Sequence, residues 1–173
     1  MKFPLHNQAT SQPLLAWLTI ALAGSVAPAL ALLVLVDAPL SLVAGPILAV
    51  GLMAAGMIAA AAAGRLRIGV LVALLNGAGL MLFARAIGIA SAPDPVSAGL
   101  AFIIASISFA ARGALFARSA SAKGWWIAVS VVAGEAAVLL TASYMPGALP
   151  DWALALLPAQ WATIAIQAAL TGT

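Results

Sequence analysis

The sequence predicts an all-α membrane protein, a bundle of six transmembrane helices arranged as three antiparallel hairpins. Of the 173 residues, 65% are hydrophobic and only 6% are charged, and the mean hydropathy is +1.19. A soluble domain carries about 25% charged residues, so this chain has too few charges to cover a surface in water. Six apolar runs near the ~20 residues that a membrane helix needs are separated by short turns, which force neighbouring helices to be antiparallel.

The polar segment 1–13 is expected to form a cytoplasmic tail before a six-span transmembrane domain at 14–170. The spans are expected at 14–36, 40–63, 66–90, 96–117, 125–145 and 152–170. The first run has an alternative interpretation as a cleaved signal peptide, because Ala29-Leu30-Ala31 has the form of a cleavage site. The run continues to Val36 and lies far from Lys2, which favours an uncleaved span.

The charges in the predicted tail and loops alternate in sign along the chain. Basic residues occur in the tail and in the second and fourth loops, and aspartates occur in the first, third and fifth: Lys2, Arg65, Arg67, Arg118 and Lys123, against Asp37, Asp94 and Asp151. Since basic loops stay on the cytoplasmic side, we expect a bacterial inner-membrane protein with both termini in the cytoplasm.

The three aspartates also follow a regular spacing. They are 57 residues apart, each in a turn that contains proline. This spacing indicates either a threefold repeat of one helical hairpin or the ordinary recurrence of six spans of standard length.

Two rows of small residues occupy the second and third spans. One row is Gly56, Ala60 and Gly64, and the other is Gly69, Ala73 and Gly77. Such rows let helix backbones approach closely. They predict tight packing within the bundle, and a dimer interface is the alternative.

Four polar residues within the spans form a candidate site at the middle of the membrane: Glu135, Asn76, Gln160 and Arg112. An ionised side chain at this depth costs about 2.5–3.5 kcal/mol or more, so Glu135 needs a partner. Arg112 is the arginine closest to it in depth. The pair is either a structural contact that fixes neighbouring helices or part of a site for a solute or a proton. In a further alternative, Arg85 and Arg112 simply reach the two membrane interfaces.

Three prolines, Pro28, Pro46 and Pro158, also fall within expected spans. Each removes a helical hydrogen bond and is expected to kink its helix. A kink beside Gln160 is compatible with a transporter site as well as with ordinary bundle packing.

The sequence offers no set of catalytic groups. It has no cysteine and a single histidine, His6, so we expect no metal site and no cofactor. The few basic residues are spread over loops, which argues against nucleic-acid binding. The expected partners are the lipid bilayer and other membrane subunits or a second copy. The leading hypothesis is a non-enzymatic accessory or scaffold subunit of a membrane complex. A small transporter or solute-binding component is the alternative, and a membrane-embedded enzyme is third.

Overall fold

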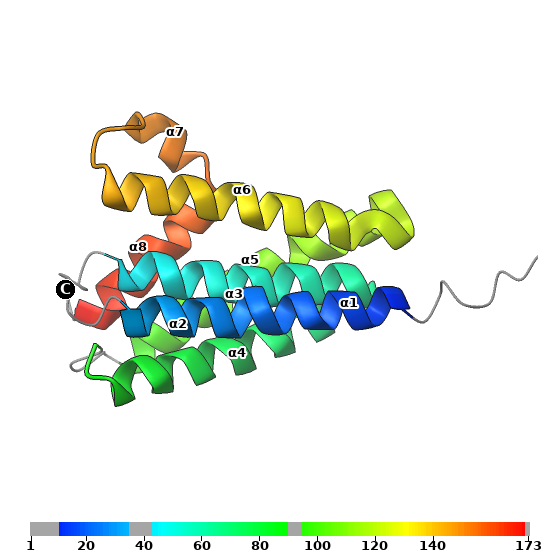
Figure 1. Ribbon diagram of the computed structural model, residues 1–173, viewed down its shortest axis with the longest axis horizontal. Coiled ribbons are helices and arrows are strands. Elements are labelled where there is room, and N and C mark those ends of the chain that lie inside the picture. Colours follow the sequence, from blue (N-terminus) through cyan, green and yellow to red (C-terminus); the bar gives the residue numbers. More distant parts are fainter. Residues whose placement is uncertain (1–10, 35–42, 90–94, 172–173) are drawn as a thin grey trace, which may run out of the picture.

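A computed structural model of the protein describes residues 11–34, 43–89 and 95–171. These ranges are helical and contain no strand, which confirms the expected all-α class (Figure 1). Several residues used in the sequence analysis lie outside the described residues: Lys2, His6, Val36, Asp37 and Asp94.

The first three helical segments join into one continuous rod: α1 (Ser11–Thr19), the π-helical η1 (Ile20–Val26) and α2 (Ala27–Val34). Two long helices follow, α3 (Ala44–Ala63) and α4 (Leu66–Ala86). Next come α5 (Pro95–Ala120), the short 3-10 turn η2 (Ser121–Lys123) and α6 (Gly124–Tyr144). The chain ends with the five-residue α7 (Asp151–Ala155) and with α8 (Pro158–Thr171).

Four stretches of the described chain are long and apolar enough to cross a membrane: Leu14–Val34, Ala44–Ala63, Leu66–Ala86 and Val96–Tyr144. The last stretch contains both α5 and α6 with the turn η2 between them. The protein is therefore an integral membrane protein.

The helix α3 is the centre of the bundle, and the other long helices and α8 pack around it (Figure 1). It can take this position because it is apolar on all sides and rich in alanine and glycine. Its neighbours come very close: a Cβ on Gly69 would lie 2.5 Å from the Cβ of Ala60, and one on Gly113 would lie 2.1 Å from the carbonyl oxygen of Met57.

The residue Gly64 plays a different part from the rest of its row. Its φ is +65°, a left-handed conformation that suits glycine, and it ends α3. A Cβ there would meet nothing within 4 Å. Gly64 therefore forms the turn to α4, whereas Gly56, Gly69 and Gly77 lie where helices touch.

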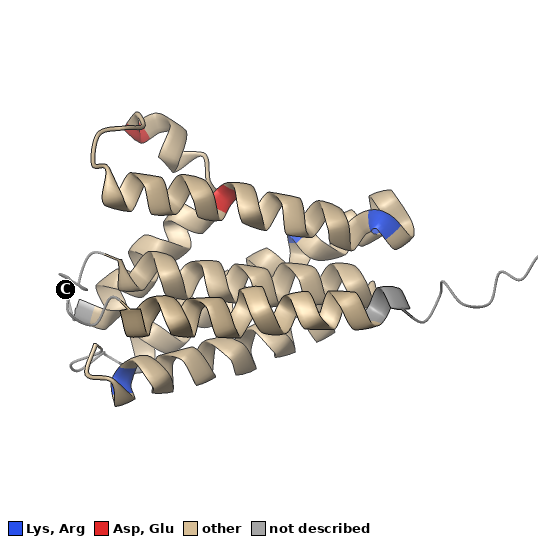
Figure 2. Ribbon diagram, viewed as in Figure 1, with Lys and Arg blue, Asp and Glu red and all other residues tan. Residues whose placement is uncertain are grey.

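The two ends of the bundle differ in charge. We call one the basic end: α3 ends and α4 begins there, and α5 turns into α6, so it carries Arg65, Arg67, Arg118 and Lys123. We call the other the Tyr144 end, where α2, α4 and α6 end and α3 begins. Figure 2 shows that charged residues are sparse along the length between them.

The expected sixth span, 152–170, is two helices rather than one. α7 ends at Ala155, and α8 starts at Pro158. The residue before a proline disfavours helical geometry, and Pro158 lacks an N–H, so the helix breaks here and restarts. Across the break the indole Nε1 of Trp161 donates a hydrogen bond to the carbonyl oxygen of Ala155 (2.9 Å). With 14 residues, α8 is about 21 Å long, too short for a core of ~30 Å.

The direction of α8 also differs from the expectation. Near its C-terminal end, Gln167 accepts a hydrogen bond from the N–H of Gly45, in the first turn of α3 (2.9 Å). Consequently α8 runs back to the Tyr144 end, where its last turns lie beside the start of α3 (Figure 1), and not to the basic end. The segments α7 and α8 together double back, so that α8 ends at the Tyr144 end of the bundle. The arrangement does not confirm a threefold repeat, because the second span of the expected third hairpin, 152–170, is two short helices and not one long helix.

Candidate functional site

The contact between Arg112 and Glu135 is present and joins α5 to α6. These helices are antiparallel through η2, which brings position 112 opposite position 135. The Nη2 of Arg112 donates to the Oε1 of Glu135 as an ion pair. Glu135 is buried, with 7% of its surface exposed, and about a quarter of the Arg112 side chain is exposed. A charge-assisted hydrogen bond of this kind offsets part of the cost of bringing both charges into the membrane.

The pair leaves some of its hydrogen-bonding capacity unused. Within the described part of the chain, the buried Nη1 of Arg112 and the buried Oε2 of Glu135 have no hydrogen-bond partner. The same holds for two other buried atoms nearby in the sequence, the hydroxyl of Ser106 and the indole nitrogen of Trp125. A buried polar group without a partner costs about 1–3 kcal/mol, and more when it is charged. The hydrogen-bonding groups of the pair are therefore satisfied only in part.

The second polar cluster, centred on Asn76, lies on another face of α3. The Nδ2 of Asn76 donates to the carbonyl oxygens of Gly24 (2.8 Å) and Gly51 (3.2 Å). Its Oδ1 accepts a hydrogen bond from the hydroxyl of Ser25 (2.5 Å). One amide thus ties α4 to both η1 and α3, and both of its Nδ2 protons and its oxygen have partners.

The local sequence of the first span explains why Asn76 is needed there. Pro28 has no N–H to give to the carbonyl of Gly24, its partner four residues earlier in an α-helix. The backbone widens into the π-helical η1, where the N–H of Ala27 bonds to the carbonyl of Leu22, five residues back. The side chain of Asn76 donates to the Gly24 carbonyl, which Pro28 cannot serve as a residue with an N–H would in an α-helix.

The remaining predicted site residue, Gln160, is not part of either cluster. It lies in the first turn of α8, and its side chain makes no hydrogen bond to another described residue. The four predicted residues are therefore divided among three places. Ser25 and Gln167, which also bond between helices, were not predicted. Gln167 could have been identified because it is the one other amide in the last apolar run.

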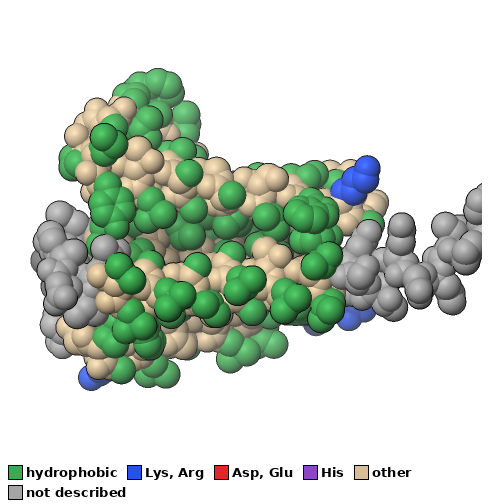
Figure 3. Space-filling model, viewed as in Figure 1, with side chains coloured by type: hydrophobic (Ala, Val, Ile, Leu, Met, Phe, Trp, Pro, Cys, Tyr) green, Lys and Arg blue, Asp and Glu red, His purple; other side chains and the backbone are tan. Residues whose placement is uncertain are grey.

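Three hollows in the described part of the chain are predominantly apolar. One of about 240 Å³ lies between α2, α3 and α6, and one of about 260 Å³ lies between α5 and α8. A wider, shallow groove beside α1 and α4 is lined by Ser25 and Asn76 among apolar side chains. Hydrophobic side chains cover most of the visible surface in Figure 3. Among the described residues no group of three His, Asp or Glu side chains could hold a metal ion.

Comparison with known proteins gives no further guidance. No protein family, curated protein or solved structure matches this chain significantly.

Proposed function

We propose that this integral membrane protein is a non-enzymatic accessory or scaffold subunit of a larger complex in the cytoplasmic membrane of a bacterium. One observation supports it best: the polar groups within the spans are used in contacts between helices. Asn76 bonds to two other segments, and Glu135 bonds to Arg112. A solute carrier commonly places such groups around a cavity at the midplane. Here the cavities are mostly apolar, as a packing unit requires.

The rest of the bundle is also consistent with a packing unit. The central α3 is locked by backbone approaches, such as that of Gly113 to Met57, which leave no room even for a methyl group. Outside this core, α4 exposes a ridge of large side chains, Leu71, Leu75 and Leu82. This face is compatible with lipid and equally with the apolar surface of another membrane subunit.

The test is the composition of the protein's native assembly. The tagged protein, expressed from its own promoter, would be extracted in a mild detergent and measured by native mass spectrometry. The proposal predicts one partner at a fixed ratio, recovered again when that partner is tagged instead. It also predicts that the partner's amount in the membrane falls when this chain is deleted. A lone protein, together with unchanged membrane proteins after deletion, would contradict the proposal.

One observation favours a second candidate, a small transporter. The Oε2 of Glu135 and the Nη1 of Arg112, which have no hydrogen-bond partner among the described residues, lie in the two helices that pack against the short α8. Helices that end inside the membrane are common at transporter sites. Proteoliposomes with a pH dye inside and an imposed membrane potential would measure proton flux. Flux in the native protein that Glu135→Gln abolishes, without loss of thermal stability, would favour this candidate over the scaffold.

A further inference from the structure

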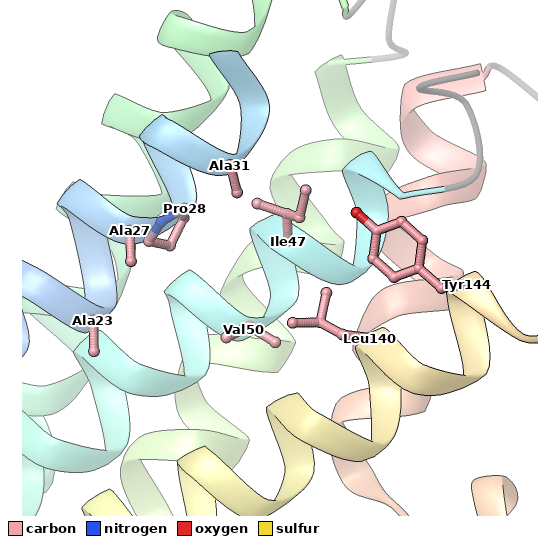
Figure 4. Close-up of a pocket in the computed structure, with 8 residues that line it drawn as sticks. All are labelled: Ala23, Ala27, Pro28, Ala31, Ile47, Val50, Leu140 and Tyr144. Carbon is pink, nitrogen blue, oxygen red and sulfur yellow. The ribbon is translucent and has the colours of Figure 1, made fainter. Parts of the chain in front are cut away.

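An apolar groove runs along the Tyr144 end of the bundle, between the first span and α6. Its floor is formed by Ile47 and Val50 of α3, and α6 contributes Leu140 and Tyr144 to one wall (Figure 4). The other wall consists of small residues of η1 and α2: Ala23, Ala27, Pro28 and Ala31. The groove encloses about 240 Å³ and opens to the outside of the bundle.

The recess in this wall follows from the sequence of the first span. Ala23, Ala27 and Ala31 are spaced four residues apart, so their short side chains lie on one face of the rod. The ring of Pro28 is buried toward α3, where its Cγ lies 3.0 Å from the position of a Cβ on Gly51. The rod therefore sits tight against α3 while its alanine face leaves space beside it.

The position of the groove restricts what can fill it. Tyr144 is the last residue of α6, so the groove starts near one membrane interface and extends inward along α3. Apolar walls of this kind offer water no hydrogen-bond partners, and cavities lined only by hydrocarbon stay dry. The occupant is therefore apolar along the length of the alanine face.

The groove is too small to enclose a helix of a partner or of a second copy. From Ala23 to Ala31 the rod rises about 12 Å, and a helix is about 10 Å across, so a helical segment of that length fills roughly 900 Å³. The groove holds about 240 Å³. A single hydrocarbon chain is narrow enough to enter, and the bilayer around the protein supplies such chains.

The side chain of Tyr144 places a hydroxyl group at the mouth of the groove. It is 58% exposed, and its hydroxyl makes no hydrogen bond to another described residue. Tyrosine is enriched at this depth because its ring is apolar and its hydroxyl reaches the headgroups. We propose that the groove binds one acyl chain of a membrane phospholipid, with the Tyr144 hydroxyl donating to an ester or phosphate oxygen of that lipid. This site does not depend on the proposed scaffold function.

The test is native mass spectrometry of the whole protein, delipidated and then mixed with phosphatidylcholine as the probe. The proposal predicts one lipid that survives collisional activation. Ala27→Leu and Ala31→Leu, which fill the groove, should each lower the retained fraction at least tenfold. Tyr144→Phe should weaken binding about threefold to tenfold, the loss of one hydrogen bond. Ala78→Leu, an exposed position on α4, is the matched control and should bind like the native protein.

Thermal unfolding in the same detergent would establish that each variant is folded. If one of the two groove-filling variants does not fold, the other tests the proposal by itself. Full lipid retention by a folded Ala27→Leu or Ala31→Leu protein would overturn the proposal. So would an equal loss in Ala78→Leu, since the lipid would then be bound without a specific site. A protein subunit that remains attached to the native protein and is released by Ala27→Leu would show that the groove holds a partner instead of a lipid.

Discussion

The central helix α3 lies between two polar clusters that differ in charge and in how completely their hydrogen bonds are formed. The cluster around Asn76 is neutral, and the donors and the acceptor of the amide all have partners. The pair formed by Arg112 and Glu135 is charged, and each partner leaves one buried atom without a hydrogen bond. The neutral cluster includes a bond to the Gly24 carbonyl, which Pro28, having no N–H, cannot serve. The pair compensates only for the burial of its own charges.

The two clusters are expected to differ in how much free energy of unfolding a mutation removes. In membranes, a hydrogen bond between helices contributes about 0.6 kcal/mol on average, because the separated helices find other partners. Removing one member of a buried ion pair costs about 3–5 kcal/mol, since the other charge stays behind. The ion pair has the less complete hydrogen bonds, yet breaking it is expected to cost more free energy of unfolding than breaking the Asn76 cluster.

The largest effect is expected at the ion pair. Glu135→Gln and Arg112→Met should each lower the free energy of unfolding by about 3–5 kcal/mol, because each leaves a buried charge alone. The double variant should lose less than the sum of the two, since both charges leave together. Unfolding in detergent micelles, followed by circular dichroism, measures all four proteins of this cycle.

Additive losses in that cycle would show that the two side chains do not interact in the folded protein. A mild Glu135→Gln variant, with a loss below about 1 kcal/mol, would remove the contrast between the two clusters.

A smaller effect is expected at Asn76. Asn76→Leu should cost about 1–2 kcal/mol, because the carbonyl of Gly24 loses its donor. The cost should shrink in a Pro28→Ala background, where residue 28 regains an N–H that can bond to Gly24. Equal losses in both backgrounds would mean that Asn76 does not substitute for the missing N–H. The same unfolding assay applies.

The smallest effect is expected at Ser25, whose hydroxyl donates only to the Oδ1 of Asn76. Ser25→Ala should cost about 0.6 kcal/mol, the average for such a bond. The matched control is Ser130→Ala, because Ser130 bonds only to the carbonyl of Trp126 in its own exposed helix face. A Ser25→Ala loss no larger than that of the control would place Ser25 outside the cluster.

The sequence predicts the ion pair better than it predicts the hydrogen bonds of Asn76. Comparing the depths of the arginines was enough to pair Arg112 with Glu135, because an ionised group inside a membrane has few partners to choose from. The same comparison grouped Asn76 with Glu135, whereas the side chain of Asn76 bonds to the first span and to α3. Depth does not show which side of α3 a residue faces, nor that Asn76 would bond to a carbonyl of the first span.

The last apolar run shows a second limit. Over 152–170 hydropathy does not distinguish one crossing helix from a broken hairpin, since both bury the same residues in lipid. Pro158 marked the break, but proline is also common inside membrane helices that cross completely. The direction of α8 depends on contacts far apart in the sequence, such as the bond between Gly45 and Gln167, which no local pattern contains.

The return of α8 to the Tyr144 end leaves the half of α5 and α6 near the basic end without the last helix beside them. Single cysteines in this cysteine-free chain test it through an impermeant thiol reagent applied to intact cells and to inverted vesicles. The chosen variants are Thr171→Cys, Ala148→Cys at the Tyr144 end and Ala122→Cys at the basic end, each fully labelled after detergent as the control. The structure predicts that positions 171 and 148 react from one face and position 122 from the other. Labelling of 171 from the same face as 122 would show that the last segment crosses the membrane, and would contradict the structure.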